Sequence, residues 1–345
     1  MPSISFLSQI ALDLGSENTY VLLDDKSPVY RCASCVLLDA HKEGTVYAAG
    51  DEARHMDGRT GEDTLLFSPI QYGGVADSEL AAMLLLSAIE KASGRRRGLD
   101  KSRLVFAIPD GATRVERAAL AQAAQLAGAK RTLLVKAPLA AAIELKKHVE
   151  RAEAQLMVSI GAQVTEVCVM SGCGIALSRH MKTGSAAFDA AIVEYIRKKH
   201  ELVISSLLAD EIKRDLGTAV APTTEITQTL SGRSVRTGKP VTVQLSSQEI
   251  YEALSAPVEA LIGAICDALY HVPADCSGDI LKNGICLTGG GSELFGLAER
   301  LGEDTQLEIH HSIHPSFDAV KGAYQIAQDD KMVRALTNAY SAYEI

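Results

Sequence analysis

The chain has 345 residues, and because one hydrophobic core rarely grows beyond about 250–300 residues, two lobes or domains are expected. Hydrophobic residues make up 47% of the sequence and charged residues 22%, which excludes a mainly disordered chain and indicates a soluble globular protein. The net charge is −9 and the only basic run is Arg95–Arg97, so no affinity for nucleic acid is expected.

The cysteines and the start of the chain bear on its location. Seven scattered cysteines without a secretory signal predict reduced thiols in the cytoplasm. Cys32 and Cys35 have the spacing of half a zinc or redox site, but no second pair completes it, which favours a structural role. We find no apolar run near the roughly 18 residues that cross a membrane. Residues 1–10 are apolar enough for a weak membrane-surface contact, and a frayed strand end is the equal alternative.

The first predicted element is a pair of strands, Ile10–Leu23, joined by a polar turn that contains Gly15. The segment Leu156–Met170 has the same pattern around Gly161. The two segments match at four pairs of positions: Asp13 with Ser159, Gly15 with Gly161, Thr19 with Thr165, and Val21 with Val167. A hairpin repeated about 145 positions apart predicts two duplicated lobes that face each other.

A strand, a helix and a strand follow the first hairpin. Leu104–Pro109 is an apolar run typical of a buried strand. Thr113 and Glu116 form a capping box and Gly128 supplies a stop, which predicts a helix between Thr113 and Gly128. Leu133–Val135 is then another strand. This order predicts a parallel or mixed sheet covered by helices.

Two further helices are predicted in the second half of the chain. Apolar residues between Phe188 and Ile196 fall on one helical face. Ser246 and Glu249 form a second capping box, which begins a helical stretch that Pro257 should kink or divide. A short apolar strand, residues 285–288, comes later and leads into a third glycine turn.

Glycine turns after strands let backbone N–H groups approach phosphate oxygens closely. The residues of the three turns are Gly15, Ser16, Glu17 and Asn18; Gly161, Ala162 and Gln163; and Gly289, Gly290 and Gly291 with Ser292 and Glu293. Ser292 and Glu293 are also expected to begin a helix. A single glycine turn between two strands usually binds no phosphate. The order of the three turns and the strands that flank them together predict a nucleotide site.

Three polar residues add to this site. Asp13 ends its strand, where a carboxylate would hold a water-coordinated Mg²⁺ against a phosphate; a solvent-facing turn residue is the alternative. Asp210 and Lys213 lie three positions apart on a predicted helix. They would offer an acceptor and a donor to a ribose, although by themselves they are an ordinary salt bridge.

These residues resemble MreB, a bacterial homologue of actin, within the superfamily that also holds sugar kinases and the large heat-shock chaperones. The resemblance spans nearly the whole chain. The motifs that carry it are Ala11–Thr19, Ala49–Ala53, Gly58–Thr60, Gly74–Asp77, Ile108–Arg117, Asp210–Gly217 and Leu287–Gly291. The first resembles a phosphate motif, and the last two resemble the nucleoside-contacting helix and the adenosine motif.

The resemblance implies an α/β actin-like fold, with two duplicated lobes around a nucleotide cleft and a smaller subdomain inserted in each. Lobe I is expected at 1–145 with its small subdomain at about 31–67, and lobe II at 146–315 with its small subdomain at about 184–243. Residues 316–345 are expected to return to lobe I.

The resemblance also implies function. It implies ATP or ADP with Mg²⁺ in the cleft, assembly with itself into a filament, and a role in cell shape and the organisation of cell-wall synthesis. Inner-membrane cell-elongation proteins are the implied partners. The implied location is the cytoplasm, with membrane association as an alternative.

The chain departs from the family pattern around the γ-phosphate. The second phosphate motif usually reads Asp-Ile-Gly-Gly-Gly-Thr-Thr, whereas this chain has Ser159 at the first position and Ala162-Gln163-Val164 near its end. Lys136-Ala137 replaces the usual pair of glutamates before a proline. Ser185-Ala186 replaces the usual Gly-Asp.

A carboxylate, glycines and a hydroxyl are therefore lost where water and the γ-phosphate would be held. We predict a degenerate hydrolytic centre at Lys136, Ala137, Ser159 and Val164, with weak or lost ATP hydrolysis. A competent but slow ATPase filament and a non-polymerising actin-like adaptor are the alternatives.

Overall fold

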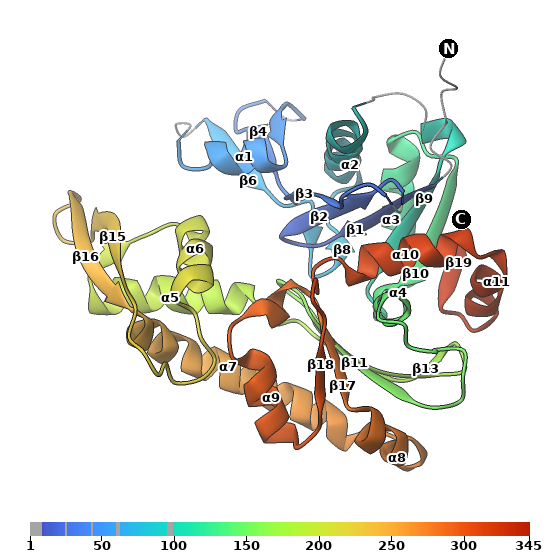
Figure 1. The fold of residues 1–345 in the computed structure, drawn as a ribbon. Helices are drawn as coiled ribbons and strands as arrows, with labels where there is room; N and C mark the ends of the chain where they lie inside the picture. Colours follow the sequence, from blue (N-terminus) through green and yellow to red (C-terminus); the bar gives the residue numbers. More distant parts are fainter. Residues whose placement is uncertain (1–8, 25, 43, 60–62, 95–98) are drawn as a thin grey trace.

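The computed structural model describes residues 9–24, 26–42, 44–59, 63–94 and 99–345. Arg95–Arg97 and most of the predicted membrane-contact segment lie outside the described residues. The chain forms two α/β lobes, each built on one large sheet, and Figure 1 shows the first lobe above the second.

The sheet of lobe I has the strand order β19-β10-β9-β1-β2-β3. Its strands are β1 (Gln9–Leu14), β2 (Asn18–Leu22), β3 (Tyr30–Ala33), β9 (Arg103–Ile108), β10 (Arg131–Lys136) and β19 (Ala342–Glu344). β1, β9 and β10 are parallel, and the other strands join antiparallel. The last strand, β19, brings the C-terminal segment back to this sheet beside β10.

Helices cover both faces of this sheet, because successive residues of a strand point to opposite faces. Ile10 and Leu12 pack against α2 (Ser78–Ser93) and α3 (Arg114–Leu126). Ala11, between them, faces the helices α4 and α10. The helices on this second face are α4 (Ala137–Glu144) and α10 (Asp318–Gln328), and α11 (Asp330–Asn338) follows α10. The α3 capping box of Thr113 and Glu116 is confirmed.

The sheet of lobe II repeats this plan, with the order β13-β12-β11-β17-β18. Its strands are β11 (Gln155–Ile160), β12 (Thr165–Ser171), β13 (Gly174–Met181), β17 (Ile285–Thr288) and β18 (Ile309–His311). The strands β11, β12 and β13 form an antiparallel meander, and β17 and β18 run parallel to β11. The strands β1, β2 and β3 with β9 and β10 have the same arrangement in lobe I. The repeated hairpins that the sequence predicts are thus the central strands of two matching sheets.

One face of the lobe II sheet packs against long helices, and the other face packs against α4 of lobe I. The helices of lobe II are α5 (Ala186–Lys199), α6 (Ser206–Leu216), α7 (Ser247–Tyr270), α8 (Ala274–Asn283) and α9 (Leu297–Thr305). Met157 and Cys168 of this sheet share one buried cluster with Leu139 of α4 and Val320 of α10. The helices α4 and α10 therefore form a layer between the two large sheets.

Each lobe carries a smaller sheet, and both small sheets lie on the left of Figure 1. In lobe I it consists of β4 (Val36–Asp39), β5 (Val46–Ala49) and β6 (Thr64–Phe67), with α1 (Asp51–Met56). In lobe II it consists of β14 (Leu202–Val203), β15 (Thr227–Ser234) and β16 (Pro240–Ser246), beside α6. A separate hairpin, β7 (Ile70–Gln71) and β8 (Gly74–Val75), connects the small sheet of lobe I to α2.

Two details of the predicted helices are corrected. The helix α7 runs without a break through Pro257, so the expected division is wrong. A proline removes one backbone hydrogen bond, whereas the buried residues Leu254, Val258 and Leu261 hold both halves against the core of lobe II. Glu293 lies inside a short 3₁₀ turn, Gly290–Glu293, and the next α-helix begins only at Leu297.

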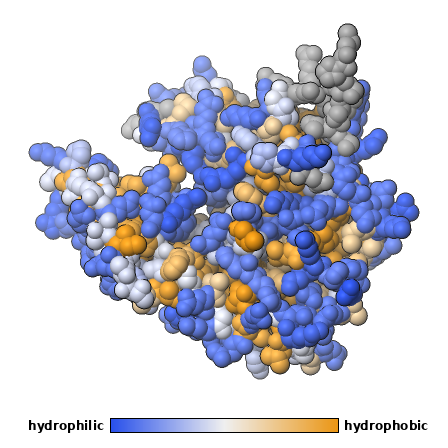
Figure 2. Space-filling model, viewed as in Figure 1, coloured by the Kyte–Doolittle hydropathy of each residue, from blue (hydrophilic) through white to orange (hydrophobic). Residues whose placement is uncertain are grey.

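The structure also corrects the expectation about segments that could cross a membrane. Among the described residues, one helix, α7, is long and apolar enough to span a membrane, which contradicts the expectation that no such run exists. The apolar side chains of its inner face pack in the core of lobe II. Figure 2 shows a mainly hydrophilic face of the molecule with hydrophobic residues in small separate groups.

Candidate functional site

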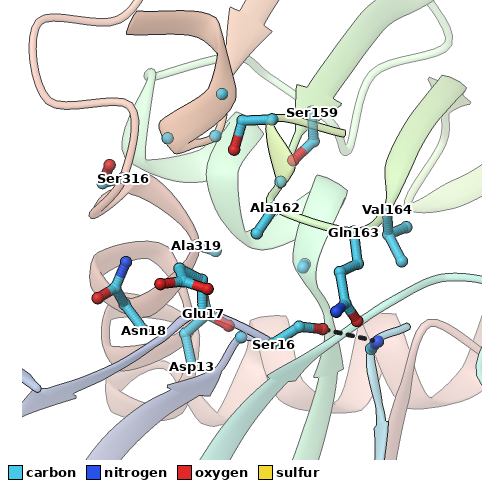
Figure 3. Close-up of a pocket in the computed structure, with 18 of the residues that line it drawn as sticks. Asp13, Ser16, Glu17, Asn18, Ser159, Ala162, Gln163, Val164, Ser316 and Ala319 are labelled. Carbon is cyan, nitrogen blue, oxygen red and sulfur yellow. Dashed lines mark hydrogen bonds between the residues drawn. The ribbon is translucent and has the colours of Figure 1, made fainter. Parts of the chain in front are cut away.

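The three glycine turns line one cavity of about 330 Å³ between the lobes. The first turn connects β1 to β2, the second connects β11 to β12, and the third follows β17. Figure 3 shows residues of the first two turns pointing toward the same space. β1 pairs in parallel with β9 in one large sheet, and β11 pairs in parallel with β17 in the other. Both β1 and β11 end at this cavity, which explains why segments far apart in sequence meet here.

The first two turns have the same backbone geometry. The Gly15 N–H donates to the Asn18 carbonyl at 3.1 Å, and the Gly161 N–H donates to the Val164 carbonyl at 2.8 Å. A Cβ at Gly15 would lie 2.7 Å from the Asn18 oxygen, and one at Gly161 would lie 2.9 Å from the Val164 oxygen. Only glycine fits such turns, so the repeat extends from the strands to the turn backbone.

The third turn lies against the second. Gly289 has a left-handed φ of 85°, and a Cβ on Gly291 would meet the Ile160 side chain at 2.5 Å. Gly290 and Glu293 line the cavity, but Ser292 is buried behind the turn. The Ser292 hydroxyl donates to the Gly289 carbonyl at 2.7 Å and lies 3.0 Å from His311 Nε2, so it supports the turn from outside the cavity.

Asp13 lines the cavity at the end of β1, and a second carboxylate, Glu166 of β12, lies near it. Enclosure of Asp13 raises the pKa of its carboxyl to about 7, and the charge of Glu166 adds to this shift. Two carboxylates in one enclosed space favour a bound cation.

These residues fit Mg²⁺, which proteins hold through one or two carboxylates while phosphates and water complete the shell. Within the described ranges, no group of three or more His, Cys, Asp or Glu side chains forms a ready metal cage. A magnesium ion here would therefore depend on a phosphate ligand, with Asp13 and Glu166 as carboxylates that line the same cavity.

Sequence reasoning missed Glu166. It is 5% exposed, and its Oε1 accepts from the Asp110 N–H at 2.7 Å across the lobes. His180 Nδ1 lies 3.5 Å from the same oxygen, and hydrogen bonding to Glu166 raises the pKa of His180. A charged residue directly before the apolar run of β12, residues 167–170, was the available signal.

Asp210 and Lys213 both line the cavity from α6. Lys213 Nζ lies 2.9 Å from Asp210 Oδ1 and 2.6 Å from Asp189 Oδ1, so two carboxylates hold its ammonium. Burial raises the pKa of Asp189 to about 6, although Lys213 opposes the shift. Sequence reasoning did not find Asp189, which stands on α5 just after the altered Ser185-Ala186 segment.

The residues of the predicted hydrolytic centre divide into two groups. Ala137, Ser159 and Val164 line the cavity, together with Ala162 and Gln163 of the second turn. Lys136 does not line it. Lys136 Nζ lies 2.7 Å from Asp110 Oδ1, and both side chains are mostly buried. The lysine charge is thus matched by Asp110 and is not directed at the cavity.

Two matching α/β lobes with a glycine-lined cavity between them define the class of actin-like proteins. The profile described as MreB/Mbl protein matches residues 7–335, so the chain belongs to the MreB/Mbl family. The predicted family and actin-like fold are thereby confirmed.

Curated relatives agree with this assignment. The cell shape-determining protein MreB of Escherichia coli (strain K12) is 32% identical over 308 residues, which cover 88% of each chain. The cell shape-determining protein Mbl of Bacillus subtilis (strain 168) is 32% identical over 305 residues, covering 88% of this chain and 91% of Mbl.

Solved structures show the same fold. The structure of MreB5 of Spiroplasma citri bound to ADP has a TM-score of 0.86 and 25% identity, and the match covers 96% of this chain and 98% of that one. A MamK double helical filament has a TM-score of 0.76 at 23% identity, covering 93% of this chain and 98% of that one. The MamK comparison supports the fold alone.

Proposed function

We propose that this protein binds an adenine nucleotide with Mg²⁺ in the cavity between its lobes and assembles with itself into filaments. The observation that carries the proposal is the convergence of three glycine turns and Asp13 on one cavity. Similar MreB5 structures contain ADP and AMPPNP, which supports ATP or ADP as the ligand.

Each part of the cavity has a chemical role in this proposal. The backbone N–H groups around Gly15 and Gly161 face the phosphates, because such concave turns attract anions. Asp13 holds Mg²⁺ through water. Asp210 accepts from the ribose, and the Gly289–Gly291 turn contacts the nucleoside. Lys213 keeps Asp210 ionised and oriented through their ion pair.

Hydrolysis by this site is proposed to be weak. Ala137, Ser159 and Val164 line the cavity but offer neither a carboxylate nor, at Val164, a hydroxyl to position the attacking water. Loss of one positioned polar group commonly lowers a rate by about 10²–10³, so several losses leave little turnover.

A slow but competent ATPase is the second candidate, and Glu166 favours it. This carboxylate lies at the cavity next to Asp13, where it could orient a water molecule. Its hydrogen bond with the Asp110 N–H competes for the same lone pairs, which is why weak hydrolysis remains the main proposal.

The cellular role follows from the family. A filament in the cytoplasm that influences cell shape and organises cell-wall synthesis is proposed, with inner-membrane cell-elongation proteins as partners. A filament needs a head-to-tail contact that does not close on itself. Association with membranes is proposed only as a weak contact that many copies in a filament would add together.

Sedimentation and electron microscopy of the purified protein with ATP, with ADP and without nucleotide test this function. We expect polymer above a critical concentration and tighter nucleotide binding in the presence of Mg²⁺. Asp13→Ala should reduce the magnesium effect, whereas Asp275→Ala, which removes an exposed carboxylate on α8, should not. A protein that stays monomeric under every condition, including with lipid vesicles, would instead be an adaptor.

A further inference from the structure

A side chain of the second glycine turn crosses the cleft to lobe I. Gln163 Oε1 accepts a hydrogen bond from the Tyr72 N–H at 2.9 Å, and Tyr72 belongs to the β7–β8 hairpin. The next N–H of that hairpin, at Gly73, donates to Ser16 Oγ at 3.4 Å. In Figure 3 the Gln163 side chain points from its turn toward Ser16. Two consecutive N–H groups of the hairpin thus contact the first and the second glycine turn, one from each lobe.

The hairpin is held in a conformation that directs these N–H groups into the cleft. Tyr72 and Gly73 have φ values of 50° and 77°, in the left-handed region that a tyrosine rarely adopts. A Cβ on Gly73 would lie 2.6 Å from Pro109 Cγ, so the hairpin packs tightly on the end of β9. Such backbone persists only where its surroundings fix it.

A second residue of lobe II reaches the same hairpin. Lys182 Nζ lies 5.5 Å from the centre of the Tyr72 ring, within the range of a cation–π interaction. Lys182 follows β13, and Gln163 precedes β12, so contacts from two neighbouring segments of lobe II converge on Tyr72. The hairpin therefore bridges the lobes at the phosphate end of the cavity.

This contact bears on the length of phosphate chain that the cavity accepts. Gln163 lines the cavity from the second turn, and its partner Tyr72 is followed by Gly73, which contacts Ser16 of the first turn. The N–H groups of these two turns are the ones proposed to face the phosphates. A third phosphate at this position would have to displace the carboxamide from Tyr72. A phosphate chain shorter by one group leaves the bridge intact.

We propose that Gln163 is a specificity-determining residue that closes the phosphate end of the cleft and makes the site select a nucleoside diphosphate over a triphosphate. This inference rests on the proposed nucleotide binding. Loss of one net hydrogen bond of about 1.4 kcal/mol corresponds to a tenfold change in affinity, so a preference on the order of tenfold is expected.

The bridge itself is tested without nucleotide by amide hydrogen exchange at Tyr72. Gln163→Met keeps the length of the side chain but removes the acceptor, and we expect Tyr72 exchange to accelerate on the order of fivefold. Gln163→Glu keeps an acceptor and should retain protection. Gln125→Met, on the exposed face of α3, is the matched control and should leave Tyr72 exchange unchanged.

Selection is tested by calorimetric titration with ADP and with AMPPNP, each with Mg²⁺. The wild-type protein and Gln125→Met should favour ADP, and Gln163→Gly should bring the two dissociation constants together. Equal wild-type affinities, or unchanged Tyr72 exchange in Gln163→Met, would overturn the role of Gln163 while leaving nucleotide binding in place. If neither nucleotide binds the wild-type protein, the proposed function and the selection fail together, whereas faster Tyr72 exchange in Gln163→Met would still support the bridge.

Discussion

Gly322 of α10 is the position where a single methyl group should most directly disturb the helix layer that α4 and α10 form between the two large sheets. An added Cβ would overlap the carbonyl oxygen of Ala140 on α4, far inside the 3.0 Å that real Cβ contacts respect. The obstacle is backbone, which no rotation of a side chain relieves. Gly322→Ala must therefore push α10 away from α4.

The cost can be estimated from the surroundings of this crossing. Val320 and Ala323, on either side of Gly322, are fully buried in the cluster that α4 and α10 share with both large sheets. Overpacking of such a core costs about 1–3 kcal/mol, and separation of the helices adds lost contacts. Alanine regains about 1 kcal/mol of helix propensity. We expect a net loss of about 2–3 kcal/mol.

Thermal unfolding measures this prediction, because a loss of that size lowers Tm by about 3–4 °C in a chain of this length. Gly263→Ala is the matched control: Gly263 is exposed inside α7, and an added Cβ there would have nothing within 4 Å. The control should raise Tm slightly. If Gly322→Ala has the same Tm as the wild-type protein, α4 and α10 do not pack as closely as described.

Three further predictions concern the cleft and its edge. Phosphate release should be near background and should rise on the order of tenfold or more when the lost groups are restored together; the substitutions are Ala137→Glu, Ser159→Asp, Ala162→Gly and Gln163→Gly. Robust release by the wild-type protein, abolished by Asp13→Ala, would refute weak hydrolysis. Because the pKa of Asp13 rises from 3.8 to about 7 on folding, its contribution to stability is present below pH 4 and lost as the pH rises through 7. The loss should reach at most about 4 kcal/mol without nucleotide, and melting curves of Asp13→Asn between pH 4 and 8 should lack it. Lys136→Met leaves the Asp110 carboxylate enclosed without its cation and should cost about 3 kcal/mol in urea unfolding. Adding Asp110→Asn should recover most of that loss, and a Lys136→Met variant as stable as the wild type would contradict the pairing.

The sequence by itself determined the elements whose signals are local. The two hairpins follow from apolar strands around Gly15 and Gly161, because strand periodicity and a turn that excludes Cβ act within a few residues. The capping boxes of α3 and α7 lie within four residues each and form as predicted. The repeated pattern also predicted two duplicated lobes, and the structure shows that each is built on a large sheet with the repeated hairpin at its centre.

Only the tertiary structure decided which polar groups meet. The partners of Glu166 and Gln163 lie 56 and 91 positions away, at Asp110 and Tyr72. No local preference encodes such pairs, because they depend on how two separately built sheets face each other across the α4–α10 layer. The same burial overrode the local effect of Pro257, and it enclosed Lys136 with Asp110, away from the cavity. A backbone preference acts over a few bonds, whereas the pairing of buried charges requires the assembled lobes to exclude water.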